Sequence, residues 1–259
     1  MMAIFDEFTG LWVREFHPAS PAAATLSCFP HAGGSASFYF PFSRQLSPAL
    51  AVRAVQYPGR QDRLKEPCEE DLLTLARRAF EALRPITGAR PALFGHSMGA
   101  VLAFEVARML EQEAGVTPAH LFVSGRRAPS IHRPESVHRR DDAGLVAEVR
   151  RLAGTDSQAL DDEEILRMAL PAIRGDYKAI ETYVYRPGPP LSCPITSFIG
   201  DEDPRVSIED ARAWREHTTG EFDMKVFTGG HFYLNEHREA ICDQISGKLL
   251  TADSRRPGA

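Results

Sequence analysis

The sequence has no hydrophobic run long enough to cross a membrane, since no apolar stretch approaches the ~20 residues of a membrane helix. Residues 1–7 have neither the basic start nor the hydrophobic core of a secretory signal. We therefore expect a cytoplasmic protein with no membrane partner.

Cysteine is scarce as well. The four cysteines, Cys28, Cys68, Cys193 and Cys242, show neither Cys-x-x-Cys pairs nor the Cys/His spacing of a zinc site. We expect buried or idle thiols, and nothing in the sequence requires a metal or an organic cofactor. A lysine- and arginine-rich run is also absent and the net charge is -5, which argues against a nucleic-acid partner.

The composition suits one sizeable α/β domain. The chain has 259 residues, of which 43% are hydrophobic and 25% are charged. We expect this domain over residues 1–251 and a disordered tail over 252–259. Apolar segments bounded by turn residues predict strands at 11–16, 25–29, 51–57, 91–94, 120–124, 194–200 and 223–227. Helical patterns separate them, which predicts a mostly parallel sheet covered by helices on both faces.

Residues 128–186 form an insertion between two of these strands, with helical patterns and no convincing strand. We expect a helical lid there. Pro171 is expected to separate two helices, and the second carries Ile173, Tyr177, Ile180 and Val184 at helical spacing. Such a stripe is typical of core packing, and a role in lining an acyl chamber is the alternative.

The pentapeptide Gly95-His96-Ser97-Met98-Gly99 lies between a buried strand and a helix. This arrangement is typical of a nucleophile elbow, in which a sharp turn lifts the serine hydroxyl clear of the sheet. The flanking glycines are needed because side chains do not fit into so tight a turn. Ser97 is therefore the predicted nucleophile, although such turns also arise for backbone reasons alone.

A serine needs a histidine base and a carboxylate that orients the histidine. His231 follows Gly229-Gly230 directly after the last predicted strand, which makes it the best base. His96, although adjacent to Ser97, is expected to serve as a packing or hydrogen-bonding residue. For the acid we select Asp203 over Asp201, because Pro204 stiffens the turn that follows it.

An oxyanion hole completes such a site. Phe29-Pro30-His31-Ala32-Gly33-Gly34 follows an early strand, where this type of fold places a loop that donates a backbone N–H group. We therefore predict the N–H groups of Ala32 and Met98 as oxyanion donors.

Several segments in the same order resemble the type II thioesterases of modular polyketide and nonribosomal peptide synthesis. The resemblance covers nearly the whole chain, and Gly175 departs from it where alanine is expected, a change read as adding flexibility at most. The segments are Phe29 to Gly34, Tyr57-Pro58-Gly59-Arg60, Gly95 to Gly99, Ser124 to Pro129, Leu170 to Tyr177, Gly200 to Pro204 and Gly230-His231-Phe232.

The resemblance implies an α/β-hydrolase fold with a helical lid and a triad of Ser97, Asp203 and His231. It also implies a thioester hydrolase that removes stalled or wrong acyl groups from the phosphopantetheine arm of acyl or peptidyl carrier domains. The alternatives are chain termination in fatty acid synthesis, acyl transfer to an acceptor other than water, a plain carboxylester hydrolase, and a non-catalytic module that binds carrier domains. We expect a monomer.

Carrier domains are commonly acidic, so a basic surface is expected to bind them. Arg126, Arg127, Arg139 and Arg140 provide a local positive bias in an otherwise acidic chain. We predict that some of these arginines contact the carrier, and solvated side chains without a partner are the alternative.

Overall fold

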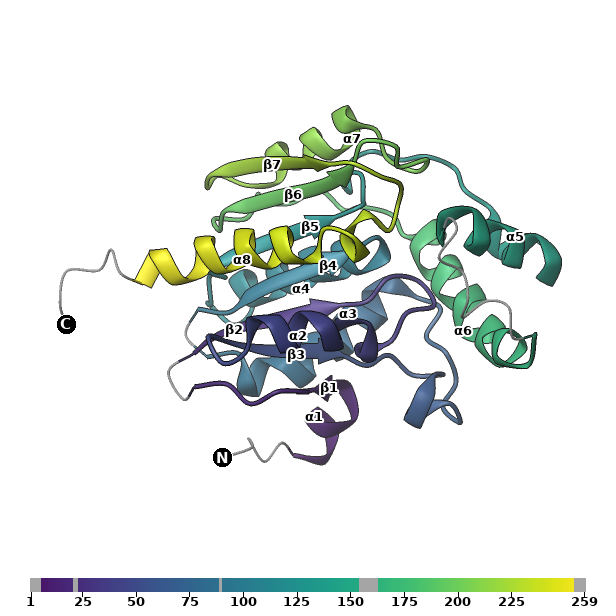
Figure 1. Cartoon of the computed structure of the whole chain (residues 1–259), viewed down its shortest axis with the longest axis horizontal. Helices are drawn as coiled ribbons and strands as arrows, with labels where there is room; N and C mark the ends of the chain where they lie inside the picture. Colours follow the sequence, from purple (N-terminus) through teal and green to yellow (C-terminus); the bar gives the residue numbers. More distant parts are fainter. Residues whose placement is uncertain (1–5, 21–22, 89, 154–162, 254–259) are drawn as a thin grey trace.

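The computed structural model describes residues 6–20, 23–88, 90–153 and 163–253. Its strands form one sheet in the order β1-β3-β2-β4-β5-β6-β7 (Figure 1). Only the β1 pairing with β3 is antiparallel, which confirms the mostly parallel sheet. The strands are β1 (Val13–Arg14), β2 (Ala24–Phe29), β3 (Leu50–Val55), β4 (Ala92–His96), β5 (His120–Ser124), β6 (Ile195–Gly200) and β7 (Phe222–Phe227).

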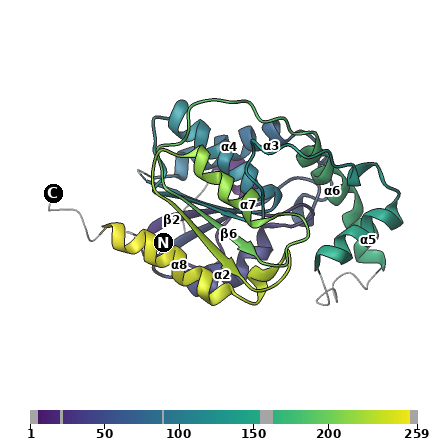
Figure 2. The same ribbon diagram turned by 90° about the horizontal axis from the view of Figure 1, so that it is seen from above.

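Helices cover both faces of the sheet, as Figure 2 shows. α3 (Leu72–Leu83) and α4 (Met98–Gln112) pack on one face, while α2 (Phe40–Leu46) and α8 (Arg238–Asp253) pack on the other. A hydrophobic core lies on each face of the sheet, and the side chains of β4 point alternately into the two. Leu93 packs in the core with α3 and α4, and Phe94 packs in the core with α2 and α8. Because both faces are covered, every residue of β4 is buried.

The predicted insertion lies between β5 and β6. It contains a 3-10 turn (Val137–Arg139), α5 (Asp142–Ala153) and α6 (Glu163–Thr182). Within the described part of residues 128–186 there is no strand, in agreement with the sequence analysis. Figure 1 places α5 and α6 together at one end of the sheet.

Pro171 does not separate two helices, because α6 continues through it. The proline ring is exposed, whereas Leu166 before it and Ile173 after it are both buried. Burial of this common face on both sides outweighs the loss of one backbone hydrogen bond at the proline.

The strand predicted at residues 11–16 is also wrong for its first half. α1 (Glu7–Trp12) occupies this position, and Asp6 caps it by accepting the Thr9 N–H at 2.7 Å. Trp12 is buried in the core on α3, so only Val13–Arg14 extends the sheet. At the other terminus, α8 runs to Asp253, two residues into the predicted tail, and residues 254–259 lie outside the described part.

Two further short helical segments follow strands of the sheet. α7 (Ile208–Arg212) follows β6 and begins with a capping box between Ser207 and Asp210. The helix predicted at 37–46 is present as a 3-10 turn (Ala36–Tyr39) that continues into α2. Among the described residues, no helix is both long and apolar enough to span a bilayer.

Candidate active site

Ser97 lies on the sharp turn between β4 and α4. Its backbone has φ 55° and ψ -117°, a conformation that non-glycine residues rarely adopt. A Cβ atom on Gly95 would lie 2.0 Å from the Gly99 carbonyl oxygen, and one on Gly99 would lie 2.0 Å from that of Phe29. Both flanking glycines are therefore required by the close approach of backbone atoms, and the strained turn holds the serine hydroxyl above the sheet.

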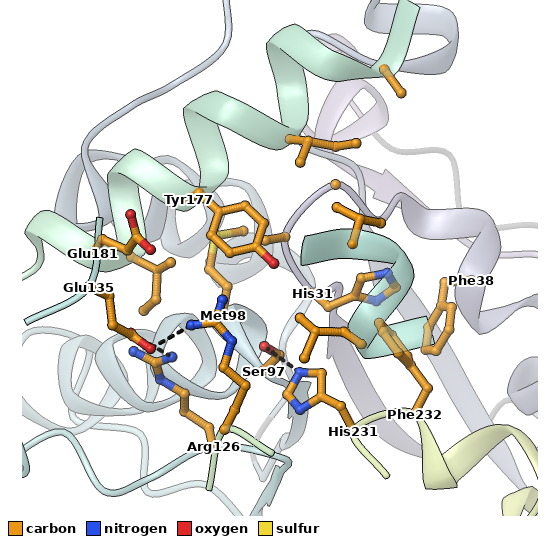
Figure 3. A pocket seen from close by; sticks show the side chains of 18 of the residues that line it. His31, Phe38, Ser97, Met98, Arg126, Glu135, Tyr177, Glu181, His231 and Phe232 are labelled. Atoms are coloured by element: carbon orange, nitrogen blue, oxygen red, sulfur yellow. Dashed lines mark hydrogen bonds and ion pairs between the residues drawn. The ribbon is translucent and has the colours of Figure 1, made fainter. Parts of the chain in front are cut away.

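A hydrogen-bonded chain links three residues that lie far apart in the sequence. The Ser97 hydroxyl lies 3.0 Å from His231 Nε2 (Figure 3). On the other side of the ring, His231 Nδ1 lies 2.8 Å from Asp203 Oδ2. With Nδ1–H donating to the carboxylate, Nε2 is free to accept the serine proton. Both the His231 and Asp203 side chains are buried, so the chain is shielded from bulk water except at the serine.

The neighbouring carboxylates have different contacts. Asp201 accepts the Gly229 N–H at 2.9 Å and so holds the loop that carries His231. Asp203, the residue chosen from the sequence, is the one that contacts the imidazole, and its second oxygen accepts the Arg205 N–H at 2.8 Å. The structure thus brings together the three residues predicted for the triad.

Two further histidines flank His231. His96 is buried and its Nδ1 lies 2.9 Å from the Ser124 hydroxyl, which confirms its expected hydrogen-bonding role. The His31 ring packs against Phe38 and Phe232. Burial, with a smaller contribution from His231, lowers the pKa of His31 to about 3 and that of His96 well below its usual value. Both rings are therefore neutral at pH 7 and place no positive charge beside His231.

Ala32 and Met98, the predicted oxyanion donors, line the same cavity as Ser97 and His231. Met98 is the first residue of α4, where backbone N–H groups lack partners within the helix. Gly33 follows Ala32 with φ 77°, and its N–H donates to Asp176 Oδ2 at 2.7 Å. The loop is thus held in one conformation beside the serine.

A cavity of about 290 Å³ opens at Ser97 beneath the insertion. Figure 3 shows an apolar side with Met98, Phe38 and Phe232. Of the predicted helical stripe, the three residues that lie on α6 are buried and line the cavity: Ile173, Tyr177 and Ile180. The prediction is wrong for Val184, which lies beyond the end of α6 at Thr182 and is 69% exposed. The first three therefore serve both predicted roles, core packing and lining.

The other side of the cavity is charged. Glu135 accepts hydrogen bonds from Arg205 at 2.5 Å and Arg127 at 2.6 Å, and it lies 3.9 Å from Arg126. Although burial opposes it, these arginines lower the pKa of Glu135 to about 2, so the carboxylate is ionised at pH 7. Burial and the neighbouring Arg127 lower the pKa of Arg126 to about 9, which still leaves it positively charged.

The predicted docking arginines therefore separate into two pairs. Arg127 is buried and Arg126 is half-buried in the cluster around Glu135, and Arg126 lines the cavity, so this pair does not form the exposed surface that was predicted. Both side chains are drawn inward by the carboxylate of Glu135, for which no role was predicted. Arg139 and Arg140 are exposed, and Arg140 lies 3.3 Å from Glu148.

Arg205 and the pair of Arg60 and Asp176 were missed as site residues. Arg205 follows Asp203 by two positions, and its guanidinium reaches Glu135 and Glu148 of the insertion. Gly175 has a role other than flexibility: a Cβ atom there would lie 3.1 Å from Cys68 Cβ, so glycine permits close packing of α6. Arg60 and Asp176 lie in segments noted for other reasons, and Arg205 directly follows such a segment, so the sequence offered no further signal for them.

No ligand set for a metal is present in the described ranges, where no group of three or more His, Cys, Asp or Glu side chains could hold an ion. The chemistry available to these residues is that of an activated serine. A strained serine, a histidine and a buried carboxylate on a mostly parallel sheet define a serine hydrolase of the α/β-hydrolase class.

Comparisons with known proteins identify the family. The profile of the thioesterase domain family matches residues 24–249, so the chain belongs to this family. Thioesterase PikA5 from Streptomyces venezuelae is 51% identical over 243 residues, covering 93% of this chain and 86% of the relative. A probable cadicidin biosynthesis thioesterase from Streptomyces griseus is 53% identical over 254 residues, covering 98% and 70%.

Among solved structures, the type II thioesterase BorB from the borrelidin biosynthetic cluster superimposes with a TM-score of 0.89 at 55% identity. The match covers 92% of this chain and 98% of BorB. The protein is thus a thioester hydrolase with the α/β-hydrolase fold.

Proposed function

We propose that this enzyme hydrolyses stalled or aberrant acyl groups from the phosphopantetheine arm of acyl or peptidyl carrier domains in polyketide or nonribosomal peptide synthesis. The observation that carries the proposal is the Ser97–His231–Asp203 chain at the mouth of an open, largely apolar cavity. The relatives named as biosynthetic thioesterases support this substrate class.

In the first half-reaction, His231 Nε2 takes the hydroxyl proton as Ser97 Oγ attacks the thioester carbonyl. The N–H groups of Ala32 and Met98 hold the resulting oxyanion. The C–S bond breaks as the carbonyl re-forms, and the pantetheine sulfur leaves and takes up the proton from His231. A thiol has a pKa near ~8.5, so its departure needs little acid assistance.

In the second half-reaction, His231 takes a proton from water, and the hydroxide attacks the acyl-Ser97 ester. The tetrahedral intermediate uses the same two N–H groups, and collapse returns the proton to Ser97 Oγ and releases the carboxylic acid. Asp203 stabilises the imidazolium in both halves and keeps the histidine in the required tautomer.

The volume of the cavity favours short acyl groups. Its volume of about 290 Å³ is at the lower end of the range of about 300–1,000 Å³ that is typical of ligand pockets. A full-length polyketide or peptide intermediate would exceed this space, whereas a short acyl unit left on a carrier arm fits it. A cavity of this size therefore suits an editing role better than the release of finished chains.

The insertion at residues 128–186 acts as the lid of this site in our proposal, because α5 and α6 supply lining residues of the cavity. The carrier domain docks beside it on a surface that includes Arg139 and Arg140, both exposed on the insertion. One chain is sufficient for the proposed reaction, since the proposed triad, oxyanion donors and cavity all come from it.

The test measures free acid released from a short acyl group on a phosphopantetheinylated carrier domain and, separately, on coenzyme A, with wild type and Ser97→Ala. Faster Ser97-dependent release from the carrier supports the proposal. Equal or faster release from coenzyme A removes the carrier as partner. Transfer to an added acceptor identifies an acyltransferase, and preference for medium over short chains identifies a fatty acid chain-terminating enzyme.

A further inference from the structure

A buried ion pair connects the insertion to the loop that carries Ala32. Arg60 Nη1 and Nη2 donate to Asp176 Oδ2 and Oδ1 at 2.6 and 2.8 Å. Arg60 follows β3, whereas Asp176 lies on α6, 116 positions further along the chain. Both side chains are almost fully buried, so this two-pronged contact is shielded from water and from salt.

The same ion pair also holds the loop backbone at both ends of the dipeptide Gly33-Gly34. Asp176 Oδ2 accepts the Gly33 N–H at 2.7 Å, and Arg60 Nη1 donates to the Gly34 carbonyl oxygen at 2.9 Å. The loop also packs closely on α6, because a Cβ atom added to Gly33 would lie only 2.7 Å from Ile173 Cγ1. The peptide next to Ala32 is thus fixed by hydrogen bonds and by packing.

Stability alone is a poor explanation for this arrangement. A buried ion pair contributes little net stability compared with apolar side chains of the same size, because both charges lose their hydration. What such a pair does provide is a fixed direction for each hydrogen bond. Here the fixed atoms belong to the backbone segment that supplies a proposed oxyanion donor.

We propose that Arg60 and Asp176 are positioning residues that aim the Ala32 N–H at the oxyanion, so that the oxyanion hole is complete only while α6 packs on the loop. The inference rests on the proposed function, in which Ala32 is a donor and Ser97 the nucleophile. Neither Arg60 nor Asp176 touches the substrate. Their effect is confined to the tetrahedral state, because only that state carries the negative charge that the N–H stabilises.

The experiment uses Arg60→Lys and Asp176→Asn, each of which keeps side-chain size while removing the two-pronged contact. We expect kcat to fall about 10- to 100-fold with KM changed less than about threefold, as for a misaimed donor rather than a lost binding contact. Arg77→Lys is the matched control: Arg77 makes an equally short two-pronged pair with Glu113, but on the exposed surface between α3 and α4. It should leave kcat within twofold.

A second readout separates positioning from a structural role. A trifluoromethyl ketone analogue forms a tetrahedral adduct with the serine, whereas an amide-linked acyl-pantetheine mimics the unreacted substrate. The variants should lose affinity for the ketone by the same factor as kcat and keep their affinity for the amide. If kcat per active site, counted by the end point of fluorophosphonate labelling, matches wild type while only Tm falls, the pair is structural and the proposal is overturned.

The rate at which a fluorophosphonate labels Ser97 tests this inference independently of the proposed function. The phosphoryl oxygen of the reagent occupies the oxyanion hole, so its reaction with Ser97 requires no thioester substrate. If wild type is labelled but releases no acid from any thioester, the proposed function fails. Slower labelling of Arg60→Lys and Asp176→Asn than of Arg77→Lys still supports positioning, and equal rates refute it.

Discussion

His120 makes the stability of this fold depend on pH, and the dependence can be measured. The histidine is the first residue of β5, buried, stacked on Phe122 and 2.8 Å from the Thr196 hydroxyl. Burial, assisted by Lys248, lowers the pKa of His120 from 6.5 to about 4. Between these two values the unfolded chain binds a proton that the folded chain does not bind. The free energy of unfolding therefore falls as the pH drops through 6.5 toward 4.

The magnitude follows from the size of this window. At pH 5, about 1.5 units below the pKa of 6.5, His120 is protonated in the unfolded chain but not in the folded one. This difference lowers the free energy of unfolding by about 2 kcal/mol. His31, whose pKa is lowered to about 3, adds about the same amount. Their sum of about 4 kcal/mol is a large part of the 5–15 kcal/mol that is typical of a folded domain.

Urea unfolding at pH 7 and pH 5, for wild type and His120→Gln, measures this contribution. Glutamine does not titrate and still hydrogen-bonds to Thr196, so the difference between the two pH values should be smaller by about 2 kcal/mol in the variant. The rate of hydrolysis at pH 7 should not change, because His120 lies at the opposite end of β5 from Ser124 and the site. An identical pH dependence in wild type and variant would refute the reasoning.

Three further predictions concern the elbow, the carrier surface and the cavity. Gly99→Ala should abolish activity and lower Tm by roughly 2–12 °C, because its Cβ atom would lie 2.0 Å from the Phe29 carbonyl oxygen. The control is Gly247→Ala inside α8, where an added Cβ atom would meet nothing within 4 Å. This variant should keep its activity and raise Tm by about 1–4 °C in the same assay and melt, because alanine suits a helix better than glycine. Arg139→Glu should raise the apparent KM for an acyl-carrier substrate roughly 2- to 5-fold but leave that for uncharged acyl-pantetheine unchanged, and equal values would remove this arginine from the docking surface. Ala169→Leu, which narrows the cavity, should reduce kcat/KM for longer acyl chains about 10-fold relative to acetyl, and an unchanged chain-length profile would place the acyl group elsewhere.

The sequence predicted those parts of the molecule that depend on neighbouring residues. The strand at 120–124 was placed with its observed ends, because a parallel strand buried on both faces is a continuous apolar run. The contacts of Ser97 and His231 were predicted for a similar reason, since each lies on a glycine-containing turn directly after a strand. Local geometry and local sequence are closely coupled in such turns.

The contacts between distant segments could not be predicted in this way. Arg60 and Asp176 lie 116 positions apart, and nothing near either residue indicates its partner. Arg126 and Arg127 were expected on the surface because arginine is mostly exposed in proteins, yet a carboxylate eight residues beyond Arg127 holds them inside. The helix boundary predicted at Pro171 was wrong because a local rule, that proline ends a helix, was outweighed by packing along the whole of α6.

The position of the insertion affects how such enzymes can be recombined. Residues 128–186 leave the sheet after β5 and return at β6, and these two strands are paired with each other. A foreign segment exchanged here leaves every strand pairing in place, so the wall of the acyl chamber that the insertion forms can be exchanged between relatives as one piece. The transplant must carry carboxylates that face Arg60 and Arg205 of the recipient, because both arginines are otherwise left buried without a counter-charge.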